Sequence, residues 1–462
     1  MKQGMTRLRT RLRRPRTQAV LLAAYTVLSA AGLAFAGPPI VWFLLLLASL
    51  LLLYYTDLPG AVKWVWAGVV VAVLLPVCAS TGSSFESFME VATQMGIYVA
   101  MALGLNVVVG FAGLLDLGFI AFFALGAYTY AIFFSDQANH FIPGHHFPLP
   151  ADLFWLCLPA GLLVAALFGV LLGLPVLRVK GDYLAIVTLG FGEIIRIIFN
   201  NLDKPVNITN GAIGISSVEA PRFFGVSLSF PHQFYYLVLA LLALVLYAVR
   251  RLEHSRIGRA WKAVREDEIA AQAMGVPLTR TKLVAFAVGA SFSGLMGVVF
   301  AAKQAFIDPT SFTMLESITI LVMVILGGMG SLPGVVVGAC LVTLLNIQLM
   351  PELTNWLNTL TTAGVIQFPS ALSPSKMQRL IFGIILILFA VFRPQGMIPS
   401  KTRRHDPAAL AKLAAEWQAQ TGGTFRAGVR PADGQDATAR APGHGAVTRA
   451  QGQDGAKEGA TL

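Results

Sequence analysis

Few residues in this sequence have the types and spacing that enzyme chemistry requires. The GxxxxGK[ST] phosphate loop, the HExxH zinc motif and the GxSxG nucleophile motif are all missing. The three cysteines, Cys78, Cys157 and Cys340, lie in or beside apolar runs and form no CxxC pair, so they predict neither a disulfide framework nor a zinc site. We therefore expect a chain that is not an enzyme, with no catalytic residues, no metal and no cofactor.

The conspicuous polar residues lie instead inside apolar stretches. They are Asn106, Asp116, Thr188, Glu193, Arg196 and Asn346. Such groups are costly at membrane depth and usually face the protein interior or a water-filled cavity. Glu193 and Arg196 are three residues apart, so they share a helix face on which they can pair. Two interpretations stay open: an ion pair that locks helices together, which this spacing favours, or residues that line a transport pathway or gate.

The composition indicates that a membrane positions these residues. Of 462 residues, 56% are hydrophobic and only 12% are charged, whereas a soluble domain carries about 25% charged residues. A helix needs about 20 apolar residues to cross roughly 30 Å of hydrocarbon. Apolar segments lie at 18–36, 40–56, 62–80, 90–110, 117–134, 153–176, 183–199, 233–249, 283–302, 314–327, 333–350 and 379–392. We predict an all-α integral membrane protein, a polytopic bundle of ten to twelve spans, some broken or re-entrant.

Glycines mark the places where helices are expected to approach each other closely. Five of them are Gly104, Gly110, Gly113, Gly118 and Gly126. Small residues let the backbones of membrane helices come into contact, so we interpret this group as packing sites rather than hinges. The stretch 330–334, which combines glycines with a proline, is predicted to be a turn at the cytoplasmic side.

Basic residues indicate the orientation of the chain. Seven Lys and Arg residues fall within the first 16 positions, none lies between Lys63 and Arg178, and eight fall within 250–282. Basic loops stay in the cytoplasm, so we predict that 250–282 and both termini are cytoplasmic. The net charge of +11 then reports orientation in a lipid membrane and not a nucleic-acid partner.

The two ends differ in composition from the apolar core. Residues 1–17 form a basic N-terminus, and the next run ends near Ala34-Phe35-Ala36, which resembles a signal-peptide cleavage site. Because that run is long and leads directly into another apolar segment, we expect an uncleaved first span. Residues 401–462 lack apolar periodicity and are predicted to form a largely disordered cytoplasmic tail.

The longest predicted cytoplasmic loop carries the most specific signal, SRIGRAWKAVREDEIAAQAMGVPLTRTK at 255–282. Asp267 and Glu268 indicate a helix start, since acids are favourable at the positive end of the helix dipole, and Gly275 indicates its end. The predicted helix, 268–274, has about two turns and would be marginal alone. We therefore expect it to pack against a partner.

The frame Ala270-Ala271-xxx-Gly275 resembles the EAAxxxG signature of importer-type ABC permeases, although Ile269 occupies the usual Glu position. In that family the short helix docks into a cleft on the cytoplasmic ATPase and transmits its closure. The resemblance implies a docking role for Glu268, Ile269, Ala270, Ala271, Met274 and Gly275.

Longer motifs are similar to the branched-chain amino acid ABC permeases of the LivM type. They are GFIAFFALGAYTYA (118–131), GDYLAIVTLGFGEIIRI (181–197), TNGAIGI (209–215), SRIGRAWKAVREDEIAAQAMGV (255–276), LGGMGSLPGVVVGA (326–339) and RPQGMIPS (393–400). The resemblance implies a permease core at 90–400, with a coupling loop at 250–282 and extra N-terminal spans at 18–89. It also implies a bacterial inner-membrane location, a LivH-type permease partner, two cytoplasmic ATPase subunits and a periplasmic amino-acid-binding protein.

Two alternative functions stay open. Urea and short-amide ABC permeases resemble the same family, and the residue pattern does not separate these substrates from branched-chain amino acids. An ion-driven secondary transporter would also contain glycine-broken segments and buried charges. The AAxxxG frame and the length of the shared motifs argue against that second class.

Overall fold

A computed structural model describes residues 15–35, 59–80, 85–142, 147–223 except 177, 178 and 180, and 225–362, with short pieces between 42 and 56 and between 380 and 398. All of these belong to one compact unit, Met1–Lys401. Several predicted segments lie wholly or partly outside the described residues: the basic residues 1–14, parts of segments 40–56 and 379–392, and the tail 401–462.

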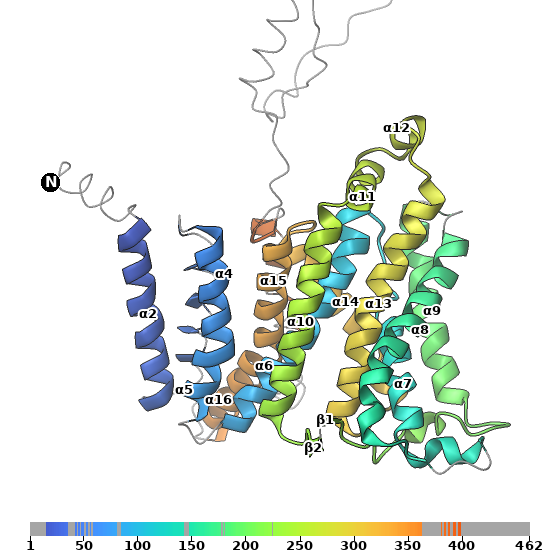
Figure 1. Ribbon diagram of the computed structural model, residues 1–462, viewed down its shortest axis with the longest axis horizontal. Coiled ribbons are helices and arrows are strands. Elements are labelled where there is room, and N and C mark those ends of the chain that lie inside the picture. Colours follow the sequence, from blue (N-terminus) through green and yellow to red (C-terminus); the bar gives the residue numbers. More distant parts are fainter. Residues whose placement is uncertain are drawn as a thin grey trace, which may run out of the picture. The chain divides into compact units, whose positions relative to one another are not determined.

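The described chain is built from helices (Figure 1). The α-helices are α2 (Pro15–Phe35), α4 (Gly60–Val69), α5 (Leu75–Ser80), α6 (Phe85–Leu105), α7 (Ile120–Phe133), α8 (Phe154–Val176), α9 (Asp182–Asn201), α10 (Pro231–Glu253), α11 (Arg256–Glu266), α12 (Glu268–Ala273), α13 (Leu278–Gln304), α14 (Met314–Gly327), α15 (Leu332–Leu344) and α16 (Met350–Thr362). The π-helical turns are η1 (Val70–Leu74), η2 (Asn106–Phe111) and η7 (Leu345–Leu349). A short hairpin pairs β1 (Arg222–Phe223) with β2 (Val226–Ser227) in antiparallel fashion.

Seven stretches of the described residues are long and apolar enough to cross a membrane. They are Glu86–Phe111, Ala151–Pro175, Tyr183–Asn201, Pro231–Glu253, Leu278–Gln304, Pro309–Gly327 and Leu332–Thr362. The multi-pass helical fold predicted from composition is thereby confirmed. The predicted segment 117–134 differs, because its helix α7 has only 14 residues and is too short for a straight crossing. The chain from Ala112 to Phe119 is not helical, and Gly113 within it has a φ of +73°.

Helix α13 is the centre of the fold. It packs most extensively against α8 and α7, and then against α6. Glycines make these contacts close, as predicted: a methyl group on Gly126 of α7 would overlap the backbone of Gly294 in α13. Gly104 of α6 is similarly close to Gly289, where a Cβ would lie 2.9 Å from the carbonyl oxygen. Such contacts gain dispersion energy that a helix surrounded by lipid lacks.

The connection between α10 and α13 contains α11 and α12. Figure 1 shows these two helices at one end of the helical unit and the β1–β2 hairpin at the other end. The predicted turn between α14 and α15 lies between Gly327 and Leu332, where Gly328 and Gly330 have φ values of +116° and +80°. Ser331 then caps α15, since its hydroxyl accepts a hydrogen bond from the Gly334 N–H at 3.3 Å.

Candidate functional site

Helix α11 is anchored to the start of α13. Its N-cap, Ser255, accepts a hydrogen bond from the Gly258 N–H at 3.2 Å. Trp261 is completely buried, and its indole N–H donates to the carbonyl oxygen of Thr281 at 2.9 Å. Val264 is buried one turn later on the same face. Burial of a large aromatic side chain with its N–H paired fixes α11 firmly against α13.

Helix α12 begins and ends where the sequence predicts, within one residue. The Asp267 carboxylate accepts hydrogen bonds from the N–H groups of Ile269 at 2.8 Å and Ala270 at 2.9 Å, so it pairs two of the free donors at the helix start. Gly275 follows the helix with a φ of +84°, a left-handed conformation that glycine adopts without strain.

Two large apolar side chains of this segment are left in the open. Ile269, which follows two acidic residues, is 78% exposed, and Met274 is 86% exposed. Ala270 is also exposed, whereas Ala271 is turned inward and is only 4% exposed. A short, well-capped helix that presents Ile and Met outward has the form of a docking element for another protein.

Glu268 ties α12 to the helix that follows. Its carboxylate accepts from the Lys282 ammonium at 2.5 Å, and the Lys282 side chain is 7% exposed. A buried ammonium needs such a partner, because an unpaired charge is costly away from water. This assigns Glu268 a contact within the chain, while Ile269 and Met274 remain available to a partner.

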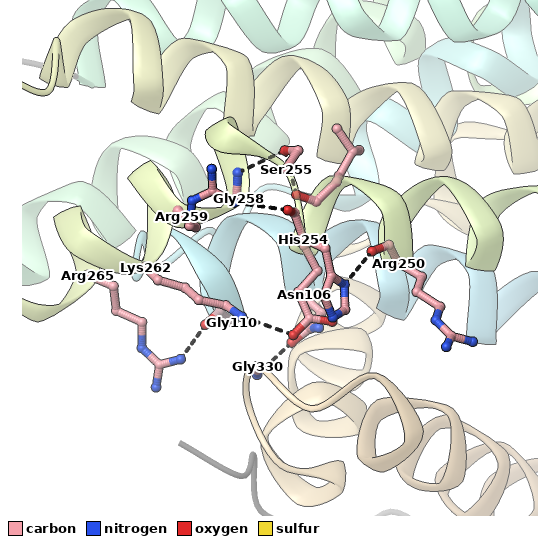
Figure 2. Close-up of polar contacts among 12 residues, drawn as sticks. Asn106, Gly110, Arg250, His254, Ser255, Gly258, Arg259, Lys262, Arg265 and Gly330 are labelled. Carbon is pink, nitrogen blue, oxygen red and sulfur yellow. Dashed lines mark hydrogen bonds and ion pairs between the residues drawn. The ribbon is translucent and has the colours of Figure 1, made fainter. Parts of the chain in front are cut away.

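A second set of contacts joins α11 to the membrane helices (Figure 2). The Arg265 guanidinium donates a hydrogen bond to the carbonyl oxygen of Gly110, in the last turn of η2. The Lys262 ammonium lies 5.6 Å from the ring centroid of Phe111, the final residue of η2. From the sequence alone, both cations indicate only the orientation of the chain. Their spacing of three residues, which places them on one helix face, was the available signal.

Asn106 joins η2 to the turn between α14 and α15. Its side-chain oxygen accepts from the Gly330 N–H at 2.8 Å, and the residue is completely buried. A Cβ on Gly110 would lie 2.6 Å from the same nitrogen, so the two backbone segments are almost in contact. Asn106 therefore satisfies a buried donor that a regular helix would have paired.

Asp116 and Thr188 stabilise the irregular segment before α7, and Thr188 joins it to α9. An Asp116 carboxylate oxygen accepts from the Gly118 N–H at 2.9 Å, and the Thr188 hydroxyl accepts from the Leu117 N–H at 3.0 Å. Both side chains are completely buried. Close packing accompanies the hydrogen bonds, because a methyl on Gly118 would overlap the Thr188 backbone.

Glu193 and Arg196 form an ion pair along one face of α9. The distance between a guanidinium nitrogen and a carboxylate oxygen is 2.8 Å, and each side chain is 32% exposed. Asn346 lies in η7 and is half-buried. Among the described residues, no hydrogen bond or ion pair joins Asn346 to the other five polar candidates. The structure thus separates these candidates into distinct local contacts.

Comparisons with known proteins identify the family and relatives of the chain. The sequence model of the family described as branched-chain amino acid transport system / permease component matches residues 87–390. The LivM permease proteins of the high-affinity branched-chain amino acid transport systems of Salmonella typhimurium and Escherichia coli K12 are each 39% identical to the chain, over 71% of this chain and 73% of the relative. The corresponding LivH protein of Salmonella typhimurium is 24% identical over 52% of this chain and 78% of its own length.

No solved structure gave a significant match. The family match covers well over half of the chain, including the α11–α12 connection and all six polar candidates. The resemblance to the LivM type is confirmed by the extent and identity of the match to the two LivM proteins. The chain belongs to the branched-chain amino acid transport system permease family.

Proposed function

We propose that this chain is a membrane-spanning permease subunit of an ATP-driven importer for branched-chain amino acids. The observation that carries the proposal is the exposed pair Ile269 and Met274, on α12 and directly after it, at one end of the helical unit (Figure 1). The sequence of this permease contains no GxxxxGK[ST] ATP-binding loop of its own. An importer of this design needs a surface through which a separate ATPase can act. The capped helix α12 supplies a surface of suitable size and chemistry.

The membrane orientation follows from the charges. The connection with α11 and α12 would face the cytoplasm, because it holds eight Lys and Arg residues. We propose that both termini lie on that side and that the whole chain makes ten to twelve crossings of the bacterial inner membrane. Residues 18–89 would add spans to a permease core at 90–400, and 250–282 would be the coupling loop.

The proposed partners complete the transport cycle. We propose a LivH-type permease as the second membrane subunit, in keeping with relatives named LivM and LivH. Two cytoplasmic ATPase subunits would supply the energy, and a periplasmic binding protein would deliver the amino acid. Since the binding protein supplies affinity, the permease needs only weak contacts with its substrate; a tight site would slow release.

The polar candidates would maintain the irregular parts of the core. Asn106, Asp116 and Thr188 each accept a hydrogen bond from a backbone N–H next to a helix break. We propose that they keep these breaks in shape during transport, and that Glu193 and Arg196 act mainly as a pair. Any contact with the moving amino acid would be brief.

Copurification tests the docking proposal. The protein, solubilised gently from its own membrane, should carry an ATPase subunit and a second homologous permease. Met274→Arg should reduce recovery of the ATPase by about tenfold, because it places a charge in an apolar contact. Ile213→Arg is a matched control, since Ile213 is 76% exposed and lies beyond the far end of α9. Recovery of the chain alone, as a homo-oligomer that moves substrate on an ion gradient, would contradict the proposal.

A further inference from the structure

Three backbone segments meet at the base of α11. They are the end of η2 at Gly110 and the turn at Gly330, both labelled in Figure 2, and the non-helical chain at Gly113. Arg265 contacts all three segments. Its guanidinium bonds to the Gly110 carbonyl, and a Cβ on Gly113 or on Gly330 would lie 2.9 Å from the Arg265 side chain. Glycine at these two positions leaves the room that the arginine occupies.

The chemistry at this junction comes from interrupted helices. The last carbonyls of a helix have no partner within it, so the Gly110 oxygen is free to accept an external donor. Gly330 lies in the turn between α14 and α15, so its N–H has no partner within a helix. This N–H donates a hydrogen bond to the side-chain oxygen of Asn106 instead. Arg265 and Asn106 thus join two helix breaks, one on each side, through hydrogen bonds to main-chain atoms.

Helix α11 and the proposed docking helix α12 are both anchored to α13. Trp261 fixes α11 to the start of α13, and the Glu268–Lys282 ion pair fixes α12 to the same helix. Because α11 and α12 follow each other directly in the chain and share this anchor, we expect a displacement of α12 to pull on the contacts of Arg265 and Lys262. Arg265 as a whole is exposed, whereas Gly110 is buried, so the hydrogen bond between them lies at the edge of the packed core.

We propose that Arg265 is a positioning residue that transmits movement of α12 to the two helix breaks at Gly110 and Gly330. This inference rests on the proposed ATP-driven function and deepens it. Lys262, through its contact with the Phe111 ring, adds a weaker link to the same end of η2. A structural role alone would require Arg265 for folding; the transmission role requires it for uptake per ATP hydrolysed.

The test measures both quantities in the complete transporter reconstituted in vesicles, with its binding protein and labelled leucine. Arg265→Gln should hydrolyse ATP at close to the unchanged rate, while leucine uptake per ATP falls by about tenfold, the effect of one lost charged hydrogen bond. Arg265→Lys should restore most of the uptake, since an ammonium can still donate to the Gly110 carbonyl.

Arg259→Gln is the matched control. It removes the same charge from the same helix, and the Arg259 guanidinium bonds to the His254 carbonyl at 3.2 Å instead of reaching η2. Equal uptake per ATP in Arg265→Gln and the unchanged protein, or an equal loss in Arg259→Gln, would overturn the inference.

If Arg265→Gln does not accumulate in the membrane, Lys262→Gln tests the inference in its place. We expect a smaller loss of uptake per ATP in Lys262→Gln, and no loss would overturn the inference. Failure of the proposed function itself is distinct, because the unchanged complex would then show no ATP-driven uptake.

Discussion

At Asp267 a single carboxylate pairs two backbone N–H groups and thereby closes the start of a six-residue helix. A helix this short has few internal hydrogen bonds to compensate for loss of its cap. Lys282 holds the other carboxylate of this turn, Glu268, so the two acids have separate tasks. We therefore expect the shape of α12 to depend on Asp267 more than on its alanines.

We predict that Asp267→Ala weakens α12 by about 1 kcal/mol, the usual cost of a lost N-cap, and lowers ATP-driven uptake severalfold. Asp267→Asn keeps an acceptor oxygen at the same place and should retain most of the uptake. Both variants are compared by leucine uptake at equal membrane level. Full activity of the alanine variant would show that the cap has no part in docking.

The Glu193–Arg196 pair gives a second prediction at this scale. Glu193→Arg and Arg196→Glu should each reduce uptake, because each leaves two like charges at 3-residue spacing on α9. The double reversal restores an opposite pair and should recover uptake to near the starting level. If the double variant stays as inactive as the single ones, the individual charges matter and the pathway interpretation replaces the pairing one.

The sequence predicted the bounds of α12 better than the contacts of the residues around it. The stop at Gly275 and the start at Asp267 are local signals, and both were recovered within one residue. Arg265 was missed because its partner is a main-chain carbonyl at Gly110, 155 residues away in the sequence. Backbone carbonyls carry no residue-type signal, so such a contact cannot be found by motif.

Among the helices, α7 and α13 cross in close backbone contact. Gly126 faces Gly294 there, and Gly161 of α8 lies beside both. The predicted role of the glycines in packing agrees with this geometry. Two helices without side chains at the crossing point gain close contact between their backbones.

Gly126→Ala should therefore overpack the crossing and cost about 1–3 kcal/mol of stability. Thermal unfolding in detergent, followed by loss of the monodisperse peak, should show a midpoint several degrees lower. Gly68→Ala in α4 is the control, because an added Cβ there meets nothing within 4 Å. An equal midpoint in both variants would mean that α7 and α13 separate easily at this point.

The broken helices were predicted only in part. Glycine-rich stretches marked the break before α7 and the turn after α14, since glycine has left-handed conformations there. The π-helical turns η1, η2 and η7 lie inside continuous apolar runs, where hydropathy alone predicts a plain span. A π turn arises from packing against neighbours, which the local sequence does not report.

For the whole molecule, the predicted orientation has a direct test. With the native cysteines replaced by serine, Met274→Cys should react with an impermeant maleimide only in inside-out vesicles. Lys204→Cys, in the exposed chain that follows α9, should react only in right-side-out vesicles. Reaction of both positions from the same side would contradict the placement of α12 in the cytoplasm.

Composition and charge were sufficient to predict a multi-pass helical protein, because the hydrophobic thickness of a bilayer dictates segment length. They did not predict that α13 would be central, because hydropathy alone does not distinguish a span in the middle of the bundle from one at its edge. The family was predicted from motifs spread over residues 118–400, and the match over residues 87–390 bears this out.

The central claim is that ATP hydrolysis, acting through α12, drives uptake of branched-chain amino acids by this permease. The most direct measurement is labelled leucine uptake by the purified complex in sealed vesicles, with the binding protein outside and ATP inside. We predict uptake that requires ATP, persists without any ion gradient and is lost in Gly275→Arg at normal membrane level. Uptake that follows an imposed ion gradient without ATP, and is unchanged in Gly275→Arg, would contradict the account.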